Sequence, residues 1–330
     1  MTDLQAPFPW FGGKRRVAAE VWSRLGDTPN YVEPFAGSLA TLLGRPVKHV
    51  GKIETINDLD GYLANFWRSV SLDPEATARY ADWPVNENDL TARHVWLTSQ
   101  RDGFQKRLEG DPEFYDPRVA GWWVAGVCGW IGSGYCAGGG PWQSVDGLLT
   151  NIKSNAGQGV NRQLPHLGDA GKGVNRQLPH LGDAGQGGIY EWFNMLASRL
   201  RNVRVTSGDW TRVVTESVTT RHGVTGLFLD PPYGSEVEQT RVYASDSGSV
   251  AADVRQWCIE NGNDRLMRIA LCGYAGEGHE QLLDHGWESH AWKTSGGYGG
   301  GRGGTGDENR AKERIFYSPH CLGAVDEGLF

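Results

Sequence analysis

The stretch LFLDPPYGSE, residues 227–236, ends a short apolar run on an aspartate, two prolines and a tyrosine. Residues 227–229 are typical of a short buried strand. Pro231 holds Asp230 out of the helical region, and neither proline can donate a hydrogen bond to a neighbouring strand. The sequence therefore predicts a stiff, extended exit from a strand that presents one carboxylate, proline carbonyls and an aromatic face. Such an exit suits a flat ring bearing an amino group, and the alternative is an ordinary strand-to-loop turn.

The bulk composition is that of a globular protein. The chain has 330 residues, 39% hydrophobic and 22% charged, which is enough for one large domain with an insertion or for two domains. Its net charge of −7 argues against a surface that binds nucleic acid everywhere but leaves room for a local basic groove. The five cysteines have no Cys-x-x-Cys spacing, and the N-terminus has no secretory leader. We therefore expect a cytoplasmic protein with reduced thiols and no metal.

Residues 119–145 carry no charged side chain and raise the question of a membrane span. Glycines interrupt the apolar part, and the glycine-rich run GGGPWQS follows it. A spanning helix needs roughly 20 consistently apolar residues. The stretch therefore predicts a buried helix followed by a loop, and no membrane contact.

Short apolar runs alternate with helical patterns on both sides of a central region. Strands are expected within residues 30–38, 54–60, 202–210, 227–233, 268–274 and 313–318, and helices within 12–26, 39–45, 61–70 and 250–262. This alternation predicts an α/β fold with a Rossmann-like, mostly parallel sheet and helices on both faces. Ligands of such sheets bind beyond the carboxyl ends of the strands. Four acids end predicted strands and are expected along that one rim: Glu33, Asp58, Asp209 and Asp230.

The central region differs in composition. Residues 71–187 are richer in Trp and Gly and have weak periodicity, so we expect a smaller inserted domain within a sheet domain formed by residues 1–70 and 188–330. Within the insert, the unit at 157–170 is repeated at 171–184 with one difference. The duplicated Gly/Arg/His loop, 157–184, is either a recent duplication in a tolerant surface loop or an arm that contacts nucleic acid.

Residues near the other strand ends predict a nucleoside pocket. Trp10 and Lys14 flank a glycine pair, and Lys14 could pair with a carboxylate. Gly37 lies at a strand-to-helix turn, where a helix N-terminus attracts an anionic group. Asp58 follows a strand at the position where nucleotide-binding sheets place an acid for ribose hydroxyls, and Asp209 could accept a hydrogen bond from an adenine amino group. Either acid alone is more often a cap or a surface residue, but together these residues predict a pocket for a nucleoside with a charged amino-acid tail.

The motifs PWFGGK, YVEPFAGS, INDLD, SGDW and LDPPY occur in this order and resemble those of adenine-specific DNA methyltransferases of the Dam type, the alpha permutation class. The resemblance covers roughly residues 7–70 and 200–318. It implies S-adenosylmethionine as cofactor, double-stranded DNA as partner, and an insert that recognises the target. The family often has a second glycine after the AGS sequence, where this chain has Leu39, so the turn is expected to approach the methionine moiety differently.

The resemblance also assigns roles to individual positions. The implied catalytic residues are Asp230, Pro231, Pro232 and Tyr233. The implied cofactor-binding residues are Trp10, Lys14, Phe35, Gly37, Asp58, Asp209 and Asp230.

The implied reaction is methyl transfer to the N6 amino group of an adenine flipped out of duplex DNA. The Asp230 carboxylate and the Pro231 carbonyl would accept the two amino hydrogens and free the lone pair, while Tyr233 stacks on the ring. The alternatives are methylation of cytosine N4 or of an RNA adenine, and a catalytically degenerate DNA-binding protein. A monomer is favoured, and both a cognate restriction endonuclease and an orphan methylase remain open.

Overall fold

The computed structural model describes residues 4–10, 14–46, 51–111, 113–130, 135–136, 142–145, 148–151, 188–232, 247–292 and 313–323. Two features singled out in the sequence, Tyr233 and the tandem repeat at 157–184, lie outside these residues.

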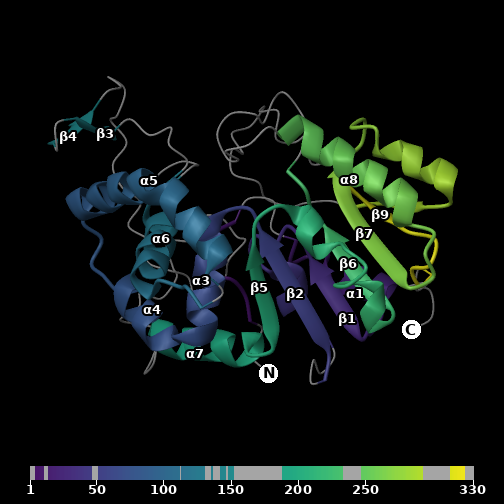
Figure 1. Ribbon diagram of the computed structural model, residues 1–330, viewed down its shortest axis with the longest axis horizontal. Coiled ribbons are helices and arrows are strands. Elements are labelled where there is room, and N and C mark those ends of the chain that lie inside the picture. The colour runs from purple at the N-terminus through teal and green to yellow at the C-terminus, as the bar shows by residue number, and fades with distance from the viewer. Residues whose placement is uncertain are drawn as a thin grey trace.

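A seven-stranded sheet in the order β5-β2-β1-β6-β7-β9-β8 forms the centre of the molecule (Figure 1). Its strands are β1 Asn30–Glu33, β2 Ile53–Asp58, β5 Val203–Ser207, β6 Thr225–Leu229, β7 Met267–Tyr274, β8 Glu288–Ala291 and β9 Glu313–Tyr317. Strands β5, β2, β1, β6 and β7 are parallel, β9 is antiparallel to β7, and β8 is antiparallel to β9. The predicted Rossmann-like sheet is thus confirmed, and five carboxyl ends meet at one edge. Strand β8 was not predicted, because its sequence, ESHA, is polar and largely exposed.

The helices are α1 Ala18–Leu25, α2 Ala40–Leu43, α3 Gly61–Leu72, α4 Pro74–Ala81, α5 Glu87–Gly110, α6 Pro117–Gly129, α7 Gly188–Leu200 and α8 Ser247–Asn261. Three short 3-10 helices, η1 Trp210–Val213, η2 Thr220–His222 and η3 His279–His285, and a hairpin of β3 Trp142–Val145 and β4 Leu148–Asn151 complete the described elements. Helices α3 to α6 each begin at an Asp or Asn whose side chain accepts a first-turn backbone N–H, at Asp60, Asp73, Asn86 and Asp116. Such caps satisfy donors that have no partner inside the helix.

The two faces of the sheet are covered separately, as the alternation of side chains along a strand requires. On β6, Leu227 and Leu229 pack in a cluster with Val254 of α8 and with residues of η1 and η3. Phe228 points the other way, into a larger cluster with residues of α1, α3, α6 and α7. Helices therefore lie on both faces, as predicted.

The helices between β2 and β5 form a layer beside the sheet, at the left of Figure 1. Phe66 of α3 contacts Trp123 of α6, with ring centroids 5.7 Å apart, and Phe193 of α7, at 5.8 Å. One core therefore runs across position 70, where the sequence places a domain boundary. The division into sheet domain and insert stays a prediction.

The uncharged stretch forms the buried helix α6 that was predicted, but residues 142–145 form a strand where a loop was expected. Among the described helices, none combines the length and apolar character that crossing a membrane would require.

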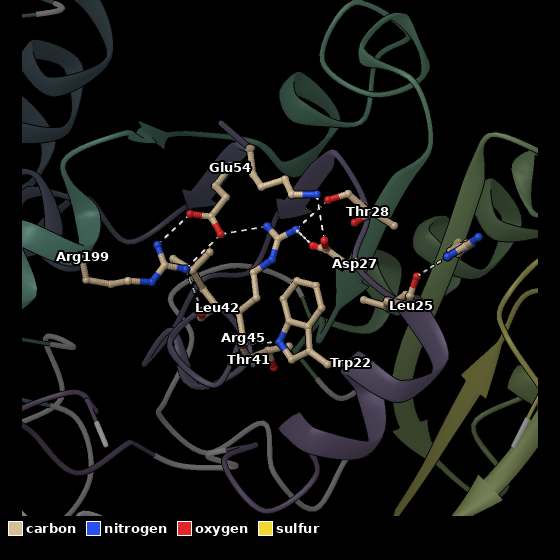
Figure 2. A network of polar contacts seen from close by, with 11 residues as sticks. Trp22, Leu25, Asp27, Thr28, Thr41, Leu42, Arg45, Glu54 and Arg199 are labelled. Atoms are coloured by element: carbon tan, nitrogen blue, oxygen red, sulfur yellow. Dashed lines mark hydrogen bonds and ion pairs between the residues drawn. The ribbon is translucent and has the colours of Figure 1, made fainter. Parts of the chain in front are cut away.

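A buried carboxylate joins three of the elements that build the sheet and its helical layer (Figure 2). Glu54 of β2 is 3% exposed and accepts hydrogen bonds from Arg45 Nη1 at 3.0 Å and from Arg199 Nη1 of α7 at 2.7 Å. Arg199 also donates to the Leu42 carbonyl of α2, and Arg45 lies 4.8 Å from the ring centroid of Trp22 of α1. Two guanidinium groups are thus removed from solvent, and one carboxylate provides most of the negative charge that balances them.

Replacing Glu54 by Gln is expected to lower the free energy of unfolding by about 3–5 kcal/mol, because it leaves two buried cations without their shared anion. Urea unfolding followed by tryptophan fluorescence measures this change. The matched control is Asp27→Asn, which removes an Arg45 partner that is 39% exposed, and it should cost less than about 1 kcal/mol. Equal losses from the two substitutions would contradict the role given to Glu54.

Candidate active site

The carboxyl edge of the parallel strands borders an open pocket of about 950 Å³, including space shared with solvent. All seven predicted cofactor-binding residues line it: Trp10, Lys14, Phe35, Gly37, Asp58, Asp209 and Asp230. Pro231 and Pro232 of the predicted catalytic motif line it too, and Tyr233 lies outside the described residues. The structure thus brings residues 10–58 together with residues 209–232.

The four acids expected along one rim, Glu33, Asp58, Asp209 and Asp230, also line this pocket. They reach it because β1, β2, β5 and β6 run parallel, so that their ends, or the turns that follow them, lie at the same edge. One neighbour was missed in the sequence. The Asn57 side chain donates to the carbonyls of Pro34 at 3.1 Å and Gly208 at 2.8 Å, and so fastens the turns after β1 and β5 to β2.

The turn after β1 depends on Gly37. Its φ of +47° is in the left-handed region, and an added Cβ would lie 2.6 Å from Nε1 of Trp10. Its N–H donates to Asp58 Oδ2 at 3.0 Å, and its carbonyl accepts from Trp67 Nε1 at 3.0 Å. A side chain at this position would push Trp10 out of the pocket wall.

Leu39, which stands where the resembling family often has glycine, also adopts the left-handed conformation, with φ 55° and ψ 25°. Its side chain is fully buried in the core, whereas its neighbours Ser38 and Ala40 line the pocket. Burial of the leucine offsets a backbone cost of about 1–2 kcal/mol. The turn thus keeps a backbone that glycine would adopt. Helix α2, which follows, has only four residues.

Asp58 is held by two backbone donors, Gly37 N–H on Oδ2 and Asp60 N–H on Oδ1 at 2.9 Å. Burial raises the pKa of its carboxyl to about 7, and these hydrogen bonds act in the opposite direction. The carboxyl is therefore close to half ionised at neutral pH.

Lys14 and Asp230 form an ion pair inside the pocket. Lys14 Nζ lies 3.0 Å from Asp230 Oδ1, with the side chains 3% and 22% exposed. Burial acts to lower the pKa of Lys14, but the negative charge of Asp230, with smaller contributions from Cys272 and Glu313, outweighs it and raises that pKa. The ammonium therefore stays charged beside the carboxylate.

Glu33, a second acid beside this pair, is 2% exposed and accepts a hydrogen bond from the Tyr31 hydroxyl at 3.0 Å. Burial raises the pKa of Glu33 to about 8, and the nearby Asp230 adds to the rise. At neutral pH Glu33 is therefore mostly protonated.

Asp209 has a structural task as well as a place in the pocket wall. Its Oδ1 accepts from the Thr211 N–H at 2.9 Å and from the Thr211 hydroxyl, which caps η1. Next to it, Trp210 packs against Phe35, with ring centroids 6.2 Å apart and an interplanar angle of 30°. Phe35 and Asp209 thus form one side of the pocket, aromatic and acidic.

The pocket is lined by carboxylates, backbone amides and aromatic rings. Across the described residues, no three His, Cys, Asp or Glu side chains gather as a metal site requires. All five cysteines are free thiols.

Residues 10–107 match the family model described as D12 class N6 adenine-specific DNA methyltransferase. The matched segment contains Trp10, Lys14, the turn after β1 and Asp58, and it extends through α3 and α4 into α5. No curated protein matches the chain. The match favours adenine in DNA over cytosine N4 and RNA, while the finer assignment to the Dam type stays a prediction. The match covers less than a third of the chain, and together with the strand order and the pocket it supports an N6 adenine-specific DNA methyltransferase.

Proposed function

We propose that the pocket at the carboxyl edge of the sheet binds S-adenosylmethionine and that residues 230–233 carry out methyl transfer to adenine N6 beside it. Methyltransferases as a class take their methyl group from this donor, and the D12 class acts on DNA adenine. The observation that carries the proposal is the Lys14–Asp230 ion pair, which lies in the same pocket as Gly37 and Asp58.

The residues that line the pocket fit S-adenosylmethionine. Each Asp58 oxygen already accepts one backbone N–H, and a carboxylate has about four acceptor positions, so capacity for ribose hydroxyls remains. Phe35 and Asp209 offer a ring face and an acceptor for an adenine ring. When bound, S-adenosylmethionine supplies an electrophilic methyl group on a positively charged sulfur.

The remaining chemistry belongs to this chain. Adenine N6 is a poor nucleophile because its lone pair is delocalised into the ring. Asp230 and the Pro231 carbonyl would accept its two hydrogens, and the two prolines add no N–H that could compete for those acceptors. Lys14, at 3.0 Å, holds one Asp230 oxygen in place. Most of the acceleration then comes from positioning and electrostatics.

The wider assignments are extensions of this proposal. The target adenine leaves the duplex to reach the pocket, Tyr233 stacks on it, and residues 71–187 contact the bases around it. The enzyme is of the Dam type and acts as a monomer in the cytoplasm. It acts either with a cognate restriction endonuclease or as an orphan methylase.

Asp230→Asn is expected to reduce methyl transfer by about 10³-fold, because a neutral amide accepts the amino hydrogens more weakly and no longer balances Lys14. Transfer of labelled methyl groups to duplex DNA measures activity, and fluorescence anisotropy with the same duplex measures binding. Duplex affinity should change less than about threefold. The control is Asp253→Asn on the exposed side of α8. If the duplex affinity fell as far as the activity, Asp230 would be a structural residue.

The affinity for S-adenosylmethionine should fall as pH decreases through about 7, the pKa of Asp58. Ribose hydroxyl donors favour the carboxylate, so affinity is at its full value above that pKa and drops toward tenfold per pH unit below it. Calorimetric titration at several pH values measures this dependence. Asp58→Asn should bind weakly with a flat profile, and Glu33→Gln should retain the transition near 7. A flat wild-type profile between about pH 5.5 and 8 would exclude Asp58 as the ribose acceptor.

A further inference from the structure

Three tryptophans and two arginines of the helical layer alternate in the order Trp83, Arg93, Trp122, Arg118, Trp96, with each arginine beside two rings. Arg93 Cζ lies 5.0 Å from the Trp83 ring centroid and 5.4 Å from that of Trp122. Arg118 Cζ lies 5.3 Å from Trp122 and 5.4 Å from Trp96. We call these five side chains the Trp–Arg ladder. They come from α5, α6 and the segment between α4 and α5.

Cation–π contact with two rings restrains each guanidinium, and its N–H groups can still donate to acceptors outside the ladder. In the part of the chain that the structure describes, neither Arg93 nor Arg118 has a hydrogen bond or an ion pair. Arg45 and Arg199 differ, since their guanidinium groups donate to Glu54. The two ladder arginines are thus pre-oriented cations without an internal acceptor.

The ladder is accessible. Trp83 is 43% exposed and Arg118 is exposed, while Arg93 and Trp122 are partly exposed. Trp83, Arg93 and Trp122 line a shallow groove of about 370 Å³ between α5 and α6. An anionic group can therefore reach the edge of Arg93.

Helix α5 connects the ladder to the active-site edge. Near its C-terminal end, Gln105 Nε2 donates to Ser207 Oγ at the end of β5, at 3.2 Å. Arg93 precedes Gln105 by twelve residues, which is ~18 Å along a helix. Duplex DNA advances ~3.4 Å per base pair, so this distance corresponds to about five base pairs. A duplex with one base in the pocket can extend over the ladder.

We infer that the Trp–Arg ladder binds the sugar–phosphate backbone of the substrate duplex, a few base pairs from the target adenine. The inference rests on the proposed function, which puts the target base at the carboxyl edge. Phosphate oxygens match the planar, bidentate edge of a fixed guanidinium. The net charge of −7 means that contacts to DNA have to be local, and the ladder supplies two fixed positive charges in one place.

The test is the salt dependence of duplex binding, measured by fluorescence anisotropy over a series of NaCl concentrations. Each lost phosphate contact lowers the slope of log K against log salt by about 0.9 and weakens binding about fivefold near 0.15 M salt. Arg93→Gln and Arg118→Gln should each show that change, and the double variant about twice the slope change. The loss should be similar for duplexes of unrelated sequence. Unchanged slopes in the double variant would overturn the inference.

Two comparisons make the test specific. Arg221→Gln removes an equal charge from η2, at the amino edge of the sheet beside Asn30 and Thr225, and should leave the slope unchanged. Arg93→Lys keeps the charge and should keep the slope, with weaker binding from the lost planar edge. If the lysine variant lost the slope as the glutamine variant does, the ladder would act through packing instead of phosphate contact. Failure of the wild-type protein to bind duplex DNA at all would instead count against the proposed function.

Discussion

The site depends on an ion pair at the opposite end of β2. Glu54, held by Arg45 and Arg199, joins β2 to α7, the helix that brings the chain back to the sheet after the helical layer. Glu54 is also the register partner of Val203, the first residue of β5. The ion pair thus holds α7 against β2 just before β5, which runs parallel to β2 and leads to Gly208 and Asp209 in the pocket wall. A buried charge at one end of β2 therefore supports the elements that form the pocket at the other end.

Within the pocket, burial distributes charge unequally among similar groups. Burial raises the pKa of Glu33 to about 8 and that of Asp58 to about 7, so neither carries a full negative charge at neutral pH. Asp230 has a different neighbour, the Lys14 ammonium, whose Nζ lies 3.0 Å from its Oδ1. Three carboxyl groups of one pocket thus have three electrostatic environments. Asp230, which is proposed to accept the amino hydrogens of adenine, is the carboxyl group that lies beside a buried cation. An electrostatic environment of this kind is typical of a functional site.

The sequence was sufficient for the parallel strands of the sheet and for most of the residues around the pocket, because parallel strands put their ends at one edge whatever lies between them. It did not reveal that Lys14 pairs with Asp230, since the two are distant in the chain and spacing carries no such information. The left-handed backbone of Leu39 goes against its residue type and is imposed by packing. Helices α4 and α5 were not predicted individually from the sequence, and α6 was predicted only from its uncharged apolar stretch. Buried α6 has glycines such as Gly121, which lies against Tyr80, and α5 is polar on most of its surface, so neither shows a clear period.

The two outer strands of the sheet bear on how this chain behaves in a concentrated solution. A free strand edge can recruit another chain by adding its backbone, which is how many proteins begin to aggregate. Here β8 is four residues long, with polar side chains, and its Glu288 and His290 are paired with Arg24 and Glu20 of α1. At the other margin, Arg68 donates to the Val205 carbonyl of β5 at 3.4 Å, so a helix occupies that edge. Both margins therefore resist intermolecular strand addition, and the protein can keep a broad, mostly apolar sheet without becoming a template for fibres.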